Sequence, residues 1–244
     1  MGPAQKTELL FLHALPLDGT MWAGQMHLLP GATYAPNLYS LGETVQEWAA
    51  AALKLVTGDH LIVVGCSVGG SCAIEFAAMA PERVAALVLI GTKADRQPNP
   101  VLHASAVRML REDGMARAWE TYWAPLFSRS ADKQILSEAE ELALALPIED
   151  VARGVTAFHT RPSRADFLSN FKRPVIVITG VEDIAPGHKI SAAQAEAAPL
   201  GALRVIPNCG HYVPIEQPDA LNAILREVIE ATAQNRHPDE NRDP

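Results

Sequence analysis

Residues 61–70 read LIVVGCSVGG, an apolar run that passes directly into a glycine-rich turn around Ser67. Four consecutive apolar residues bounded by a turn predict a strand that is buried on both faces, as in a parallel sheet. The turn fits G-x-S-x-G over Gly65–Gly69, a pattern that places a serine at a sharp, strained bend between a strand and a helix. It lacks the Lys-Ser/Thr of a phosphate-binding loop and the spacing of a dinucleotide-binding loop. A helix over about Val68–Met79 is predicted to follow.

Five further strands are predicted outside this stretch. They cover Glu8–His13, Ala32–Ala35, Val84–Ile90, Val175–Thr179 and Ala202–Ile206. A helix over Glu43–Val56 is predicted before the strand at Leu61–Val64. Strands that alternate with helices over short connections predict an open, mostly parallel sheet with helices on both faces. The sequence therefore predicts the α/β class.

The alternation stops between about Asp95 and Asn170, where no strand is predicted. Helical patterns there cover Val101–Glu112, Met115–Trp123 and Ser137–Leu146. Helices inserted between two strands of such a sheet predict a lid over the carboxyl ends of the strands, where ligands bind. We therefore expect a core domain in two parts, 1–94 and 171–233, and a helical lid over 95–170. The polar tail over 234–244 is expected to be disordered.

Composition and charge exclude several classes of partner. The chain has 244 residues and a net charge of −8, which offers no electrostatic footprint for nucleic acid or for an anionic membrane. No stretch approaches the ~20 apolar residues of a membrane span. Cys66, Cys72 and Cys209 show no metal-ligand spacing and favour free thiols in a reducing compartment. We expect a cytoplasmic protein without a metal, and nothing in the sequence indicates its oligomeric state.

A serine nucleophile needs a base, and the base needs an acid that orients it. Asp183 follows the strand predicted at Val175–Thr179, and His211 lies in the loop after the last predicted strand. The carboxyl ends of parallel strands meet at one edge of the sheet, so these side chains are expected near Ser67. We predict Ser67 as nucleophile, His211 as base and Asp183 as its acid partner, with Glu182 and Asp95 as alternative acids.

Stabilisation of the tetrahedral oxyanion requires two N–H donors. Val68, the residue after the nucleophile, supplies one. The other is expected from Leu15 in the loop after the first strand, because Pro16 has no N–H. His13 in the same loop is expected to brace the loop and not to act as a second base.

Together these motifs resemble the α/β-hydrolase superfamily, in particular its small lid-bearing esterases, lactonases and carbon–carbon bond hydrolases. The resemblance extends from Glu8 to about Ile229 and rests on GCSVGG at 65–70, GVED at 180–183 and GHYVPIEQPDALN at 210–222. It implies the α/β-hydrolase fold with about six mostly parallel strands flanked by helices and with a helical lid insertion. The N-terminal hairpin of the full fold is expected to be absent, since the first strand begins at residue 8.

The chain departs from the family pattern in the loop after the first strand and in the acid loop. The usual His-Gly is His13-Ala14 here, so a backbone conformation reserved for glycine is excluded or costs roughly 1–2 kcal/mol. Pro186 lies one residue nearer the acid than is commonest, which predicts a tighter acid loop.

Two segments are similar to 3-oxoadipate enol-lactonases, namely LPLDGTMW at 15–22 and GMARAW at 114–119. The resemblance implies hydrolysis of a small carboxylic ester or lactone through an acyl-enzyme on Ser67, without a cofactor. Open alternatives are a carbon–carbon bond hydrolase, a non-hydrolytic small-molecule binder and a perhydrolase.

Aromatic and basic side chains of the predicted lid are candidates for substrate contact. Apolar walls would suit an acyl or alkyl group, and arginines would suit a substrate carboxylate, although side chains at this spacing also serve packing and lid anchoring. The aromatic candidates are Trp119, Tyr122, Trp123 and Phe127, and the basic ones are Arg161 and Arg164.

Overall fold

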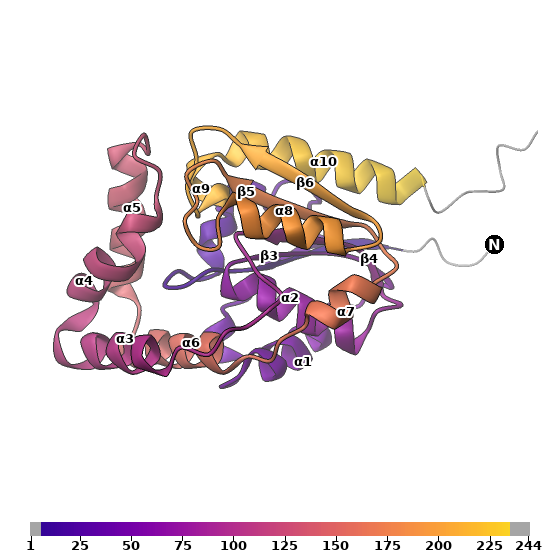
Figure 1. The fold of residues 1–244 in the computed structure, drawn as a ribbon. Coiled ribbons are helices and arrows are strands. Elements are labelled where there is room, and N and C mark those ends of the chain that lie inside the picture. The colour runs from indigo at the N-terminus through magenta and orange to yellow at the C-terminus, as the bar shows by residue number, and fades with distance from the viewer. Residues whose placement is uncertain (1–5, 235–244) are drawn as a thin grey trace, which may run out of the picture.

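Six parallel strands form the sheet of the protein, in the spatial order β2-β1-β3-β4-β5-β6. The computed structural model describes residues 6–234. The four central strands are almost wholly buried because helices cover both faces of the sheet (Figure 1). The predicted α/β class with six parallel strands is thereby confirmed. The strands are β1 (Thr7–Leu12), β2 (Thr33–Tyr34), β3 (His60–Cys66), β4 (Val84–Ile90), β5 (Val175–Gly180) and β6 (Gly201–Ile206).

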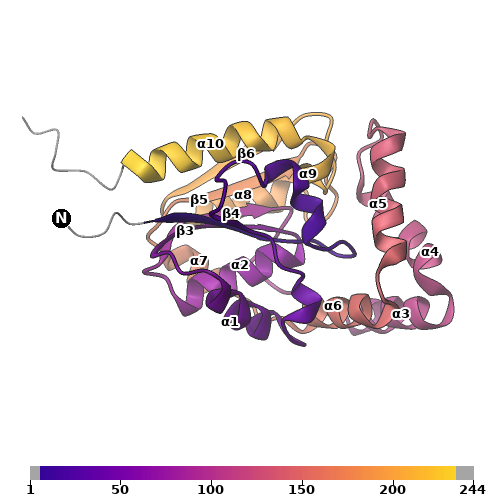
Figure 2. The ribbon, with the colours of Figure 1, turned by 180° about the vertical axis from the view of Figure 1, so that it is seen from behind.

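Helices of the core flank the sheet on both sides. α1 (Val45–Leu55) and α2 (Val68–Met79) pack against each other on one face, whereas α10 (Pro218–Gln234) crosses the other face (Figures 1 and 2). α8 (His188–Ala197) packs against β5 and β6. α2 begins directly after Ser67, so the strand, bend and helix predicted from residues 61–79 follow one another in the structure.

Residues 91–174, between β4 and β5, contain helices but no strand, and we call them the inserted segment. Most of its helices stand beyond the end of the sheet that lies opposite the start of β1 (Figures 1 and 2). Because all strands are parallel to β1, this is the end where the strands terminate. The helices are α3 (Pro100–Glu112), α4 (Gly114–Ala118), α5 (Lys133–Ala145), α6 (Ile148–Thr160) and α7 (Ala165–Asn170), with a π-helical turn over Trp119–Trp123 and a 3₁₀ turn over Ala124–Leu126.

The inserted segment differs from the sequence prediction in several helices. α6 and α7 were not predicted, and α5 begins at Lys133 and not at Ser137. A single helix was expected over Met115–Trp123, but α4 ends at Ala118 and a π-helical turn follows. A π-helix bonds i to i+5, so it rotates the following side chains relative to an α-helix. At the other end of the chain, the tail predicted to be disordered lies outside the described residues apart from Gln234.

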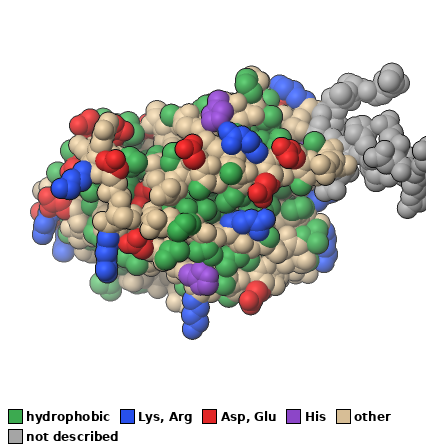
Figure 3. Space-filling model, turned by 90° about the horizontal axis from the view of Figure 1, so that it is seen from above, with side chains coloured by type: hydrophobic (Ala, Val, Ile, Leu, Met, Phe, Trp, Pro, Cys, Tyr) green, Lys and Arg blue, Asp and Glu red, His purple; other side chains and the backbone are tan. Residues whose placement is uncertain are grey.

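The face above α10 carries acidic and basic side chains interspersed with hydrophobic ones (Figure 3). Neither sign of charge gathers into a large patch on this face. Within residues 6–234 no helix is long and apolar enough to cross a membrane.

Candidate active site

Ser67 stands at the bend between β3 and α2 with φ 55° and ψ −119°, a backbone conformation that costs a non-glycine residue roughly 1–3 kcal/mol. The neighbouring glycines make this bend possible. A Cβ at Gly65 would lie 2.3 Å from the carbonyl oxygen of Gly69, and a Cβ at Gly69 would lie 2.1 Å from that of Leu12. The G-x-S-x-G spacing is therefore required by close backbone approach on both sides of the serine.

Thr92, just after β4, supports the bend from the neighbouring strand. Its hydroxyl donates to the carbonyl oxygen of Ser67 at 2.7 Å, and the backbone N–H of Ser67 donates to Ile90 at 2.8 Å. A Cβ at Gly70 would lie 2.0 Å from Oγ1 of Thr92, so the helix can approach the threonine only through a glycine. Sequence reasoning missed Thr92 because its role depends on the neighbouring strand.

Asp183 and His211 form a buried hydrogen-bonded pair, with Oδ1 of Asp183 3.1 Å from Nδ1 of His211. The N–H of Ala185 also donates to Oδ1 of Asp183, at 2.8 Å. Burial raises the pKa of Asp183, but the hydrogen bond and charge of His211 and the N–H of Ala185 together hold this pKa below its ordinary value. Asp183 is thus ionised at neutral pH, and its carboxylate holds the imidazole of His211 through Nδ1.

The two alternative acids are engaged elsewhere. Glu182 accepts the backbone N–H of Arg129 at 2.9 Å. Asp95 is exposed and accepts the hydroxyl of Ser163 at 2.9 Å. Among the described residues, Asp183 is the carboxylate that the structure brings to His211.

Glu216 braces the loop that carries His211. Its buried carboxylate accepts the backbone N–H groups of Gly210 at 3.0 Å and Tyr212 at 3.0 Å, the two neighbours of His211. It also accepts the N–H of Ser128 in the inserted segment, at 2.8 Å. One carboxylate therefore ties the histidine loop to the inserted segment. Apart from the position of Glu216 shortly after His211, no sequence pattern indicated this role.

In the loop after β1, the backbone N–H groups of Ala14 and Leu15 differ in their partners. The N–H of Ala14 points at Sδ of Met21, 3.2 Å away, whereas no hydrogen bond within residues 6–234 takes up the N–H of Leu15. Val68 is the first residue of α2, where backbone N–H groups have no partner inside the helix. Ala14 is not among the residues with positive φ, so alanine fits this loop without strain.

His13 braces the same loop. Its Nε2 accepts the N–H of Leu38 at 2.8 Å, and its Nδ1 lies 3.2 Å from the carbonyl oxygen of Ala14. Nδ1 therefore carries the proton. Burial lowers the pKa of His13 to about 4, so the ring is neutral and both its nitrogens are engaged.

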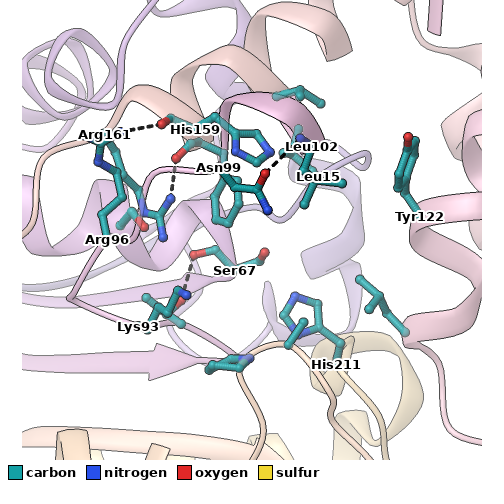
Figure 4. A pocket seen from close by; sticks show the side chains of 18 of the residues that line it. Leu15, Ser67, Lys93, Arg96, Asn99, Leu102, Tyr122, His159, Arg161 and His211 are labelled. Atoms are coloured by element: carbon teal, nitrogen blue, oxygen red, sulfur yellow. Dashed lines mark hydrogen bonds between the residues drawn. The ribbon is translucent and has the colours of Figure 1, made fainter. Parts of the chain in front are cut away.

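A cavity of about 570 Å³ opens above Ser67 and His211. Its apolar wall includes Leu15 of the core together with Tyr122, Trp123 and Leu126 of the inserted segment. Figure 4 shows Ser67 between Tyr122 and His211 on one side and the basic side chains Lys93, Arg96 and Arg161 on the other.

The structure separates the lid candidates into two groups. Tyr122 and Trp123 line the cavity, whereas Trp119 and Phe127 do not. Trp119 and Phe127 contact each other with ring centroids 5.8 Å apart, and Phe127 stacks on Tyr212 at 4.6 Å. These two rings thus join the inserted segment to the core.

The two arginine candidates also differ. Arg161 lines the cavity. Arg164 instead makes a two-pronged ion pair with Glu75 of α2, at 2.7 and 2.9 Å. Arg164 therefore anchors the inserted segment to the core.

No group of three His, Cys, Asp or Glu side chains within residues 6–234 is arranged to hold a metal ion. Cys66, Cys72 and Cys209 are buried free thiols, and burial raises the pKa of each.

Comparison with known proteins places these features in a family. A model of the alpha/beta hydrolase family matches residues 9–224. A putative 2-succinyl-6-hydroxy-2,4-cyclohexadiene-1-carboxylate synthase of Bacillus subtilis strain 168 is 27% identical over 268 residues, which cover 93% of this chain and 92% of the relative. A thermophilic esterase of Thermogutta terrifontis, with malate bound, superposes with a TM-score of 0.84 at 25% identity over 93% of this chain and 91% of that one. The enol-lactonase of Burkholderia xenovorans LB400 shares the fold, with a TM-score of 0.79 at 19% identity over 94% of each chain.

Proposed function

Since the chain belongs to the alpha/beta hydrolase family, we propose that it is a serine hydrolase that cleaves a small carboxylic ester or lactone through an acyl-enzyme on Ser67. The observation that carries the proposal is the cavity that Ser67 and His211 line together, with His211 hydrogen-bonded to the buried Asp183. The likeness to a thermophilic esterase supports ester hydrolysis. The sequence similarity to enol-lactonases adds a lactone as the cyclic form of the same bond.

The reaction proceeds in two halves. In the first, Oγ of Ser67 bonds to the carbonyl carbon while Nε2 of His211 takes the serine proton. The N–H groups of Leu15 and Val68 donate to the oxyanion of the tetrahedral intermediate. That intermediate collapses, the bond to the alcohol oxygen breaks, and His211 returns its proton to the leaving alcohol.

In the second half, water attacks the acyl-enzyme and gives its proton to His211. The acid is released when the proton returns to Ser67. Asp183 keeps the proton of the neutral imidazole on Nδ1 and stabilises the imidazolium in both halves. In this proposal the inserted segment is the lid, because it supplies Tyr122 and Trp123 to the wall that faces the substrate.

Labelling by a fluorophosphonate probe tests the nucleophile directly. The wild-type protein should be labelled on Ser67 and should hydrolyse 4-nitrophenyl butyrate. Ser67→Ala should lose both properties, and His211→Ala should slow both. Ser169→Ala, which removes an exposed hydroxyl on α7, is the matched control. Ester turnover that survives in Ser67→Ala would refute the proposal.

The similarity to the B. subtilis relative favours a second candidate, a synthase reaction at the same serine and histidine. Incubation in H₂¹⁸O distinguishes the two, because hydrolysis places one ¹⁸O from water in the acid product, whereas a synthase reaction that consumes no water places none. Mass spectrometry of the released acid provides the measurement.

A further inference from the structure

The cavity above Ser67 has a basic end. Lys93 and Arg96 follow β4, and Arg161 follows α6, yet all three line the same cavity. They lie on the side of Ser67 away from Tyr122 and His211 (Figure 4). Among the described residues, no acidic side chain lines this cavity.

Arg161 is the most buried of the three, with 4% of its surface exposed. Its guanidinium donates to the carbonyl oxygen of Phe158 and lies 4.0 Å from the centroid of the Phe158 ring. Both contacts are to uncharged groups, and no ion pair of Arg161 is present within residues 6–234. Asp95 attracts Arg161 electrostatically but forms no ion pair with it. Arg161 is therefore a buried cation that forms no ion pair with any of the described residues.

Arg96 adds a second cation beside it. Nη1 of Arg96 donates to the carbonyl oxygen of His159 at 2.7 Å, and Arg96 forms no ion pair in the described part of the chain. Burial, assisted by the charge of Arg96, lowers the pKa of Arg161 to about 10, so the guanidinium of Arg161 remains charged at neutral pH. The pKa of His159 is lowered to about 4, by burial and by His103, Arg161 and Arg96, so that ring is neutral. Two like charges thus meet at the cavity wall.

Arg83 holds the fold through the carbonyl oxygens of Val56 and Gly58, but two other arginines are paired with acids. Arg164 has Glu75, and on the surface Arg111 has Glu149. The whole chain carries a net charge of −8. In such a protein, a buried arginine without an acid is costly unless an anion from outside completes the site. Guanidinium groups match the oxygen pairs of carboxylates and phosphates.

We propose that Arg161, Arg96 and Lys93 form a subsite for an anionic oxygen group of the substrate, a carboxylate or a phosphate. The subsite rests on the proposed hydrolysis at Ser67 and specifies its substrate class: an ester or lactone that also carries a negative charge. The apolar wall around Tyr122 and Trp123 receives the uncharged part, while the basic end orients the substrate across Ser67.

Pairs of esters that differ only in a negative charge test whether the enzyme prefers an anionic substrate. The 4-nitrophenyl monoesters of succinic, glutaric and adipic acid end in a free carboxylate, and capping it as a methyl ester removes the charge at nearly the same size. For the best chain length, kcat/KM of the anionic ester should exceed that of its capped partner by about tenfold or more, the effect of about 1.4 kcal/mol. A ratio near one for all three lengths overturns the carboxylate form of the subsite.

Variants that remove one positive charge test which residues cause the preference for an anionic ester. Arg96→Gln and Arg161→Met should each bring the anionic-to-neutral ratio of kcat/KM toward one, and the half-buried Arg96 provides a variant that folds if Arg161→Met does not. Arg117→Gln is the matched control, because it removes an equal charge from an exposed position of α4 outside the cavity. A ratio unchanged in Arg96→Gln, or lowered equally in Arg117→Gln, overturns the assignment.

Binding of an anion to a variant that cannot hydrolyse esters tests the subsite independently of the proposed hydrolysis. Calorimetric titration of Ser67→Ala with glutarate, and separately with inorganic phosphate, should give saturable binding to at least one, weakened about tenfold or more by adding Arg96→Gln. Binding of glutarate alone would identify the anionic group of the substrate as a carboxylate, and binding of phosphate alone would identify it as a phosphate. Binding of neither overturns the subsite while leaving ester hydrolysis intact. Binding in a wild-type protein that hydrolyses no ester keeps the subsite and refutes the hydrolase.

Discussion

A Cβ atom at Gly91 would lie 2.7 Å from Nδ1 of His211, so the imidazole occupies the space that any other residue at this position would need. The same Cβ would lie 3.2 Å from Oδ2 of Asp183. Gly91 also has a φ of +55°, in the left-handed region that costs other residues about 1–2 kcal/mol. The backbone at the end of β4 therefore limits where the side chains of His211 and Asp183 can lie.

Gly91→Ala should displace the imidazole and lower kcat/KM for 4-nitrophenyl butyrate by about 100-fold, since a displacement of about 1 Å at a reacting group has that effect. The free energy of unfolding should fall by at least the 1–2 kcal/mol or so of the backbone term. Steady-state kinetics and chemical denaturation measure the two effects.

Gly31→Ala provides the control for backbone strain. Gly31 has a φ of +74°, but nothing lies within 4 Å of the Cβ position. Its substitution should lower stability by a similar backbone term while kcat/KM stays near the wild-type value. Equal losses of activity in the two variants would show that strain, and not the clash with His211, is responsible.

Asp183→Asn tests the acid partner. An amide at this position favours the wrong imidazole tautomer, because its NH₂ can donate to Nδ1 and its oxygen carries no charge for the imidazolium. We expect kcat to fall by roughly 10⁴-fold. Glu182→Gln, at the neighbouring carboxylate that accepts the N–H of Arg129, should leave kcat within a few-fold. The reverse ranking would move the acid to Glu182.

The lowered pKa of Asp183 also predicts how stability depends on pH. The folded state binds this proton more weakly than the unfolded state, whose carboxyl has a pKa near 3.9. The contribution of the carboxylate is fully present above that unfolded pKa and is lost as the pH falls toward the folded pKa. Between about pH 6 and pH 3 the wild type should therefore lose more unfolding free energy than Asp183→Asn does. Denaturation curves across this range would contradict the assignment if the two proteins lost the same amount.

The elements that the sequence predicted well are those specified by neighbouring residues. LIVV followed by GCSVGG describes β3, the bend at Ser67 and the start of α2 within one continuous stretch. Asp183 and His211 are likewise recognised by their place after a strand. Gly91, Thr92 and Glu216 were not found, because each acts through a contact with a residue far away in the chain, as Glu216 does with Ser128 at a separation of 88 residues.

The inserted segment was predicted less well, for a physical reason. The spacing of aromatic residues over 119–127 does not reveal which of them face a ligand, since a π-helical turn changes the direction of the side chains that follow. Tyr122 and Trp123 consequently reach the cavity and Trp119 does not. Arg161 was a candidate from the sequence, but Arg96 was not, because it comes from the other end of this segment and no local pattern indicates that the two line one cavity.

Thr92→Val should weaken the support of the nucleophile while keeping the shape of the side chain. The variant loses the hydrogen bond to the carbonyl oxygen of Ser67, worth about 0.5–1.5 kcal/mol, and leaves that carbonyl without its hydroxyl donor. We expect a fall in unfolding free energy of this size and a fall in kcat of several-fold. Thr92→Ser retains the hydroxyl and should restore kcat, whereas a serine variant as slow as the valine variant would assign the effect to packing.

Glu216→Gln should show how far catalysis depends on the histidine loop. The two carboxylate oxygens accept N–H groups from Ser128, Gly210 and Tyr212, and an amide replaces one of these acceptors by a donor. At least one buried N–H then loses its partner, at a cost of about 1–3 kcal/mol. Because Gly210 and Tyr212 flank His211, kcat should fall by about tenfold or more with the imidazole displaced.

Glu227→Gln is the matched control for this variant, since Glu227 is exposed and pairs with Arg204 at 3.7 Å. An exposed pair of this kind contributes about 0–1 kcal/mol, so both stability and kcat should stay near wild type. If Glu216→Gln lowered the unfolding free energy and left kcat unchanged, Glu216 would hold the inserted segment to the core without positioning His211. A lower kcat measured well below the unfolding temperature, with KM unchanged, is the result that makes Glu216 a positioning residue.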